Sequence, residues 1–320
     1  MHIYRNQQGV ALPSVTEIVG KTRPLSEVIK MNKSIEKKKQ RLGMTNKDWD
    51  TYMVAAQQRG TDTHTYLEAY TPLVEEANQY VIRGEKVPDN LYAKIVHVRE
   101  YWESKEVMGD YAKQLTNFIR ELNKKTRNWS IIMAEQSLIN ESLGYGGRCD
   151  TLLRINDTYI LLDLKTNGGY WSEWKKQQVY EWNLWRKPSK VDVLEMKVYA
   201  NGSTRQVKKR DSEGKVVRRS EDMPPVDERG WEWIDNKVKD KFVQLALYIL
   251  AAQDMKNRGQ FPHLINSAAI VVAFPTQYQF IKLPHAAWDG CKQESIARVK
   301  QYMEQHLDKW RLEVAFRQDF

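Results

Sequence analysis

The chain has 320 residues, with 50 Lys and Arg against 41 Asp and Glu, so its formal net charge is +9 and its sequence pI is about 9.2. Its hydrophobic fraction of 41% is too high for a disordered chain, and its longest apolar run, Leu245 to Ala252, is much shorter than the roughly 20 residues that span a bilayer. Two cysteines exclude a disulfide framework, a four-cysteine zinc site and a four-cysteine iron–sulfur cluster. We expect a soluble cytoplasmic protein (host cytoplasm if viral) with no membrane partner, whose basic charge suits nucleic acid.

Residues 1–128 are expected to form a mainly helical N-terminal region. Pro24 can open a helix and Gly43 can end it, so the first long helix should run through the basic stretch to Leu42. Turn and capping residues divide the rest of this region into shorter helices. These are expected around Trp49–Gln58, after Gly60, and near 72–83, 90–106 and 110–125.

Residues 129–320 change to short β-branched and leucine-rich runs separated by turn residues. Helical periodicity returns over Asn236–Lys256 and 287–313. The pattern predicts an α/β core, a small mixed central sheet flanked by helices. The expected strands are Ser130–Ile139, Gly147–Ile155, Thr158–Leu164, Ser267–Phe274 and a last one that ends at Leu283.

A basic, tryptophan-rich insertion at about 170–235 interrupts this core. Six of the eleven tryptophans lie between Trp171 and Trp233, and residues 170–185 are expected to be helical. Asn201-Gly202 predicts a β-hairpin that joins Val191–Tyr199 to Thr204–Lys209. The tryptophans can stack on bases of a single strand or simply pack on the core.

The net positive charge comes from two patches. The window from Arg186 to Arg219 carries +7 and the window from Lys30 to Arg41 carries +5, so the rest of the chain carries −3. Each patch can be a phosphate-binding surface or a solvated one, and the insertion can also be an arm for a protein partner.

Acidic and basic residues are spaced for one cleft at the second and third strands. Asp150 is followed thirteen residues later by Asp163, which alternates with Lys165 and therefore points to the same face of its strand. Two carboxylates held close together are costly unless a cation neutralises them, and oxygen ligands favour Mg²⁺ or Mn²⁺. A lysine beside such a metal suits phosphodiester hydrolysis, although a lone D-x-K tripeptide is most often an exposed ion pair.

These motifs together resemble the PD-(D/E)XK nuclease superfamily. The likeness is strongest to the RecB-type exonuclease branch, which includes the mitochondrial genome maintenance exonuclease and phage-encoded relatives. It implies a restriction-endonuclease-like core, here without an iron–sulfur cluster because only two cysteines are present. The matching residues are Leu12–Thr16, Gly60 with His64, Glu135, Gly147 with Asp150, Asp163-Leu164-Lys165-Thr166, and Gln244 with Tyr248.

The resemblance also implies a role for each matched residue. His64, Asp150 and Asp163 would ligate Mg²⁺ or Mn²⁺ together with the main-chain carbonyl of Leu164. Lys165 would orient the attacking water, and Glu135 matches an acidic position at the edge of the metal site. The expected catalytic residues are Asp150, Asp163, Lys165 and Glu135, and the matched residues expected to bind substrate are Gln244 and Tyr248. Arg148, Thr166 and, from the basic insertion, Lys208, Lys209 and Arg210 are also expected to bind substrate.

Several of these residues have plainer interpretations. His64 can be a helix-surface histidine, Glu135 an ordinary strand carboxylate, Gln244 a polar neighbour of the core and Tyr248 a core residue. Taken together, the motifs predict a metal-dependent DNA exonuclease that acts on single strands or DNA ends in replication, recombination or repair. A structure-specific or RNA-directed endonuclease and a catalytically silent binding module are the alternatives.

Overall fold

The computed structural model describes residues 3–166, 190–199, 202–220, 228, 230–234 and 236–318. Among these residues, no helix combines the length and the apolar character needed to cross a membrane. The segment 170–185, which the sequence predicts to be helical, lies outside the described residues.

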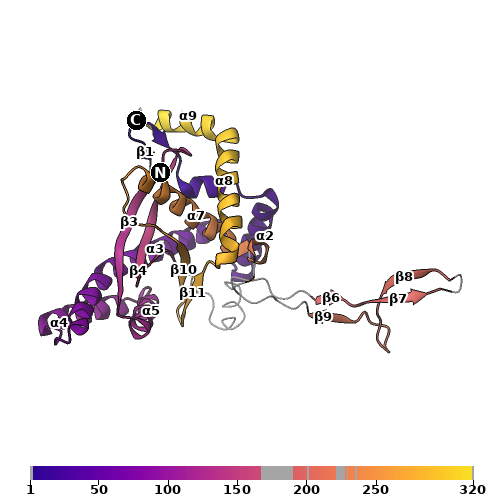
Figure 1. Ribbon diagram of the computed structural model, residues 1–320, viewed down its shortest axis with the longest axis horizontal. Coiled ribbons are helices and arrows are strands. Elements are labelled where there is room, and N and C mark those ends of the chain that lie inside the picture. The colour runs from indigo at the N-terminus through magenta and orange to yellow at the C-terminus, as the bar shows by residue number, and fades with distance from the viewer. Residues whose placement is uncertain are drawn as a thin grey trace.

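A mixed five-stranded sheet forms the centre of the molecule (Figure 1). Its strands are β3 (Trp129–Asn140), β4 (Tyr145–Ile155), β5 (Thr158–Thr166), β10 (Ser267–Ala273) and β11 (Tyr278–Lys282). The order across the sheet is β11-β10-β5-β4-β3, with β10 parallel to β5 and the other neighbours antiparallel. The expected mixed sheet and its strands are confirmed, with small differences at the ends.

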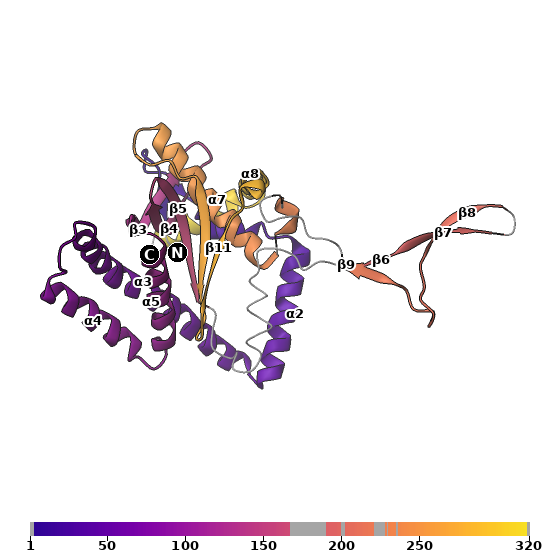
Figure 2. The same ribbon diagram turned by 60° about the horizontal axis from the view of Figure 1, so that its bottom comes forward.

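Helices cover both faces of this sheet (Figure 2). Successive residues of β10 pack into opposite layers, Ile270 with one hydrophobic cluster and Val271 with the other, which explains its uninterrupted apolar sequence. One layer contains α1 (Val15–Lys21), α7 (Asn236–Asn257) and α8 (Trp288–Gln305), and α9 (Leu307–Gln318) follows α8. The other layer contains α3 (Asn46–Ile82), α4 (Asp89–Glu103) and α5 (Gly109–Lys125).

Two helix predictions are wrong in their boundaries. The three short helices expected between Trp49 and residue 83 are one helix, α3, of 37 residues with Pro72 inside it. Proline removes one backbone hydrogen bond, but Tyr70 and Val74 on either side of it are buried, so packing carries the helix through. The single closing helix expected over 287–313 is instead divided between α8 and α9 at His306.

The basic helix α2 (Leu25–Leu42) has the predicted bounds and none of its residues is buried. Gly43 ends it in the left-handed conformation, at φ 62°. Lys38 joins α2 to α3 by a 3.0 Å hydrogen bond to the hydroxyl of Tyr52. The short strands β1 (Tyr4–Arg5) and β2 (Ala11–Leu12) pair with each other ahead of α1.

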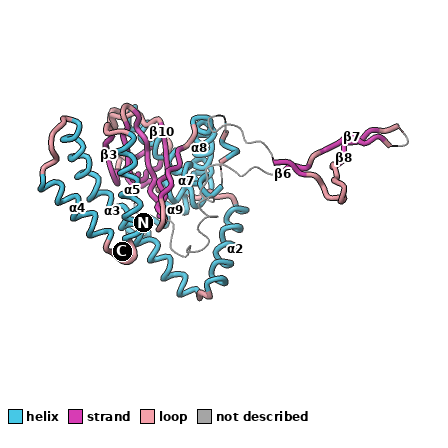
Figure 3. Tube along the Cα trace, turned by 90° about the horizontal axis from the view of Figure 1, so that it is seen from below, coloured by secondary structure: helices cyan, strands magenta, loops and turns pink. Residues whose placement is uncertain are grey.

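The predicted hairpin of the insertion is confirmed and belongs to an arm that projects from the body (Figures 1 and 3). β7 (Leu194–Val198) pairs with β8 (Thr204–Lys208), and β6 (Lys190–Asp192) pairs with β9 (Arg218–Ser220). Two single-turn 3₁₀ helices, Trp231–Trp233 and His285–Ala287, complete the described structure.

Candidate active site

The site lies where β4 and β5 part. Their ladder runs up to the pair Thr151–Leu162 and stops before Asp150 and Asp163, which come next on each strand. The Asp150 carboxylate crosses the opening and accepts a 2.9 Å hydrogen bond from the backbone N–H of Leu164. The divergence of two paired strands therefore brings the two aspartates together.

Lys165 connects the two acids. Its Nζ lies 2.7 Å from Asp163 Oδ1, 3.9 Å from Asp150 Oδ2 and 3.1 Å from the carbonyl oxygen of Leu164. Asp163 is only 1% exposed, and its Oδ2 accepts no hydrogen bond from the described residues. The predicted alternation of Asp163 and Lys165 on one face agrees with this ion pair.

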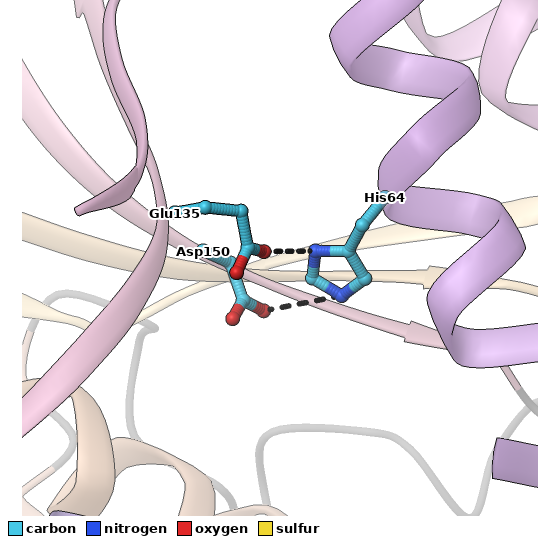
Figure 4. A group of neighbouring side chains, drawn as sticks. All are labelled: His64, Glu135 and Asp150. Carbon is cyan, nitrogen blue, oxygen red and sulfur yellow. Dashed lines mark ion pairs between the residues drawn. The ribbon is translucent and has the colours of Figure 1, made fainter. Parts of the chain in front are cut away.

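His64 and Glu135 enter the site from α3 and β3 (Figure 4). His64 Nδ1 lies 2.7 Å from Glu135 Oε1, and His64 Nε2 lies 3.8 Å from Asp150 Oδ2. Arg148 contacts the other Glu135 oxygen at 2.7 Å. Glu135 has a φ of 50°, which is rare for a residue other than glycine and marks a locally constrained backbone at this position.

Among the described residues, one group of three side chains is arranged so that it could bind a metal ion. His64, Glu135 and Asp150 can each offer one atom, and these atoms lie within 4.8 Å of one another. Imidazole and carboxylate ligands suit Mn²⁺, and the carboxylates suit Mg²⁺. The unpaired, buried Asp163 Oδ2 beside this group is an acceptor that a cation could satisfy. The residues present therefore fit a divalent cation, with Glu135 nearer its centre than the sequence suggests.

Burial and neighbouring charges shift the pKa values of Asp150 and Lys165. Burial first, and then the neighbouring Asp163, raise the pKa of Asp150 to about 6. Burial alone would lower the pKa of Lys165, but Asp163 and Asp150 outweigh it and hold that pKa above its usual value. Lys165 is therefore a fixed positive charge, suited to orienting water or phosphate rather than to accepting a proton.

A pocket of about 500 Å³ opens over these residues. Gln244 and Tyr248 of α7 line it and are joined by a 3.2 Å hydrogen bond, so the structure places this predicted pair at the site. Gly147 allows Tyr248 to approach, because a Cβ at residue 147 would lie 2.4 Å from the Tyr248 ring. Arg148 also lines the pocket.

Other polar residues, for which the sequence predicts no role, also line the pocket. Ser14 and Thr16 come from the start of α1, and Thr61, Thr65 and Glu68 lie on α3 beside His64. The spacing of Thr61, Thr65 and Glu68 around His64 on one helical face is the signal that could have identified them.

Lys241 is a further cation near the site, close enough for the charge of Lys165 to act on it, and the sequence did not indicate it. It lies one turn before Gln244 on α7, and these two are the partly exposed positions in the otherwise buried stretch 240–249. Burial first, and then the charge of Lys165, lower the pKa of Lys241. No ion pair joins Lys241 to any described residue, and the adjacent Asp240 is already bound by Arg23 and Arg298.

Four of the expected substrate-binding residues are not among those that line the pocket. Thr166 ends β5 opposite Ala273 and is absent from the pocket wall. Lys208, Lys209 and Arg210 lie on the projecting arm (Figure 1). Lys208 pairs with Asp192 at 2.6 Å, so at least one of these charges is used within the arm.

Comparison with known proteins adds no identification: no protein-family model matches the chain, and no curated protein matches it significantly. The resemblance to PD-(D/E)XK nucleases therefore stays a prediction from the motif residues.

Proposed function

We propose that this chain is a Mg²⁺- or Mn²⁺-dependent deoxyribonuclease with a PD-(D/E)XK core, which hydrolyses phosphodiester bonds of single-stranded DNA or DNA ends. The observation that carries the proposal is the convergence of Asp150, Asp163, Lys165 and His64 beside one open pocket. These residues come from three separate elements. A simple Asp–Lys ion pair on one strand does not require a histidine from α3 beside it.

His64, Glu135, Asp150 and Asp163 would hold the cation. When bound, it would supply the positive charge that polarises the phosphate and favours ionisation of a water molecule. The ammonium of Lys165 would orient that water, because it is fixed on Asp163 and the Leu164 carbonyl. Water would attack the phosphorus, the bond to one ester oxygen would break, and that oxygen would leave with a proton. No covalent bond to the protein forms.

The pocket wall is suited to holding the strand. The hydroxyl groups of Ser14 and Thr16 lie 3.1 Å apart, so one can donate to a phosphate oxygen while the other donates to its neighbour, and Arg148 and Lys241 add positive charge nearby. The hydrogen bond between Gln244 and Tyr248 fixes the orientation of Gln244 at the rim. The wall thus offers contacts to the backbone of DNA rather than to particular bases.

The test is digestion of labelled linear single strands, linear duplexes, closed circles and RNA in Mg²⁺ or Mn²⁺. We expect loss of linear DNA from the ends while circles survive. Asp163→Asn should abolish it, whereas Asp110→Asn, at an exposed helical position, should not.

Cutting of circles would favour an endonuclease at the same site, as would preferential cutting of RNA. Equal digestion by wild type and Asp163→Asn would show that the site is assigned wrongly. Binding of DNA without any cleavage would favour the catalytically silent module.

A further inference from the structure

The arm exposes an unpaired strand edge. In its outer part β7 pairs with β8, and no third strand joins them among the described residues. At the inner end the C=O of Val193 accepts from the N–H of Lys209, the residue after β8, and the N–H of Val193 donates to the C=O of Val217. At the outer end the N–H of Tyr199 donates to the C=O of Ser203 at 2.9 Å. Backbone groups of successive strand residues point to opposite edges. Since Val193 and Tyr199 bond toward β8, the N–H and C=O groups of Leu194, Met196 and Val198 point to the free edge.

The same three residues form an apolar stripe along that edge. Leu194, Met196 and Val198 are 50%, 63% and 68% exposed and share one face of the ribbon. Isolated two-stranded ribbons are marginally stable in water, and exposed apolar rows commonly mark interaction sites. Their cross-strand neighbours on this face, Gln206 among them, are polar, so the apolar surface lies at the β7 edge alone.

The opposite face carries unbalanced positive charge. Lys197 and Arg205 lie directly across from each other, an arrangement that is unfavourable for like charges. Within the described part of the chain neither forms an ion pair, while Asp192 is occupied by Lys208 and Arg218. Glu195 is the one acidic residue beside them on this face.

We propose that the β7 edge binds an extended segment of a partner protein as a third strand, in which apolar residues alternate with acidic ones. A strand added there lies about 4.8 Å from β7 and projects alternate side chains to the two faces. Its apolar side chains would cover Leu194, Met196 and Val198, and its acidic side chains would lie beside Lys197, on the face that also carries Arg205. One segment would therefore bond to the free backbone groups, cover the apolar side chains and neutralise the positive charge.

Other occupants account for less of this surface. A second copy of the chain would bring another Lys197 and Arg205 to the basic face. Duplex DNA matches the basic face and the size of a β-ribbon, but it leaves the apolar stripe exposed. The proposal is independent of the nuclease assignment, because the arm is separate from the pocket.

The experiment uses the full chain and labelled synthetic peptides of about seven residues, a typical strand length. The first peptide is Thr-Val-Glu-Val-Glu-Val-Thr, and the second has lysine in place of both glutamates. Fluorescence anisotropy should show the acidic peptide binding about tenfold more tightly than the basic one. Lys197→Glu should reverse this preference without any change to the backbone.

Two proline variants locate the edge. Met196→Pro removes an N–H at the free β7 edge and should abolish binding. Gln206→Pro removes the corresponding N–H at the outer edge of β8 and should leave binding intact. Equal binding of both peptides, or equal loss in both proline variants, would overturn the proposal. So would the absence of peptide binding together with duplex binding that Lys197→Glu removes, since the occupant would then be DNA.

Discussion

At the scale of single residues, Asp150 sets the pH response of the site. Its pKa is raised from 3.8 to about 6, chiefly by burial and secondarily by Asp163. Between these values the folded protein keeps a proton that the unfolded chain loses. The contribution of Asp150 to stability therefore falls as pH rises through this window, by up to about 3 kcal/mol.

We predict that Asp150→Asn flattens this part of the stability curve. Urea unfolding in EDTA, from about pH 4 to about pH 7, should show wild type losing more stability than the variant, because asparagine does not titrate. The exposed Asp89→Asn serves as the control and should follow wild type. Parallel curves for wild type and Asp150→Asn would show that the aspartate is not held in its neutral form.

Lys241 is the second residue whose role can be tested. Its ammonium has no ion-pair partner in the described structure and lies one turn from Gln244, so we predict that it binds a phosphate next to the one cleaved. Lys241→Gln should slow cleavage about 10- to 100-fold, the effect of losing one charge-assisted hydrogen bond. Cleavage rates of labelled single-stranded DNA measure this effect.

The control for Lys241 is Lys256→Gln at the end of the same helix, where the ammonium donates to the carbonyl of Pro262. It should cleave at the wild-type rate. A wild-type rate for Lys241→Gln as well would remove this lysine from the site.

At the scale of elements, α3 carries a pocket-lining glycine inside a long helix. A Cβ at Gly60 would meet no atom within 4 Å, so Gly60→Ala should stabilise the protein by about 1 kcal/mol. The added methyl would occupy pocket space, and we predict slower cleavage at the same time. Urea unfolding and cleavage rates measure the two effects.

Gly20→Ala in α1 is the matched control, since it too meets nothing within 4 Å but does not line the pocket. It should change stability without changing cleavage. Unaltered cleavage by Gly60→Ala would mean that substrate does not contact this part of α3.

The helices and strands show which features of the fold can be predicted from the sequence and which cannot. Period-two alternation correctly places Asp163 and Lys165 on one face, and apolar runs correctly locate the strands of the sheet. The separate helix expected near 72–83 is instead part of α3, because buried neighbours of Pro72 such as Tyr70 carry the helix through the proline. The contact between Glu135 and His64 could not be predicted by local rules, because it depends on a positive φ and on where α3 crosses the sheet.

At the scale of the whole molecule, a buried ionic network ties the N-terminal region to the C-terminal helices. Asp240 of α7 bonds to Arg23, after α1, at 2.6 Å and to Arg298 of α8 at 2.7 Å. Arg298 is 5% exposed, so its charge depends on these partners and on Glu294.

We predict that Asp240→Ala lowers the free energy of unfolding by about 3 to 5 kcal/mol, because it leaves a buried guanidinium without one of its partners. Asp289→Ala, whose carboxylate is 82% exposed and pairs with Lys292, should cost far less. Urea midpoints compare the two. Equal losses would show that the buried network does not stabilise the packing of α1, α7 and α8.

The most direct test of the proposed activity is the rate at which the full chain releases label from linear single-stranded DNA, for wild type and Lys165→Gln. With Mg²⁺ or Mn²⁺ we predict that Lys165→Gln is slower by at least about 100-fold, that EDTA stops the wild type, and that Lys86→Gln, 83% exposed, is unaffected. Cleavage by Lys165→Gln at the wild-type rate, or undiminished cleavage in EDTA, would contradict a metal-dependent nuclease at this site.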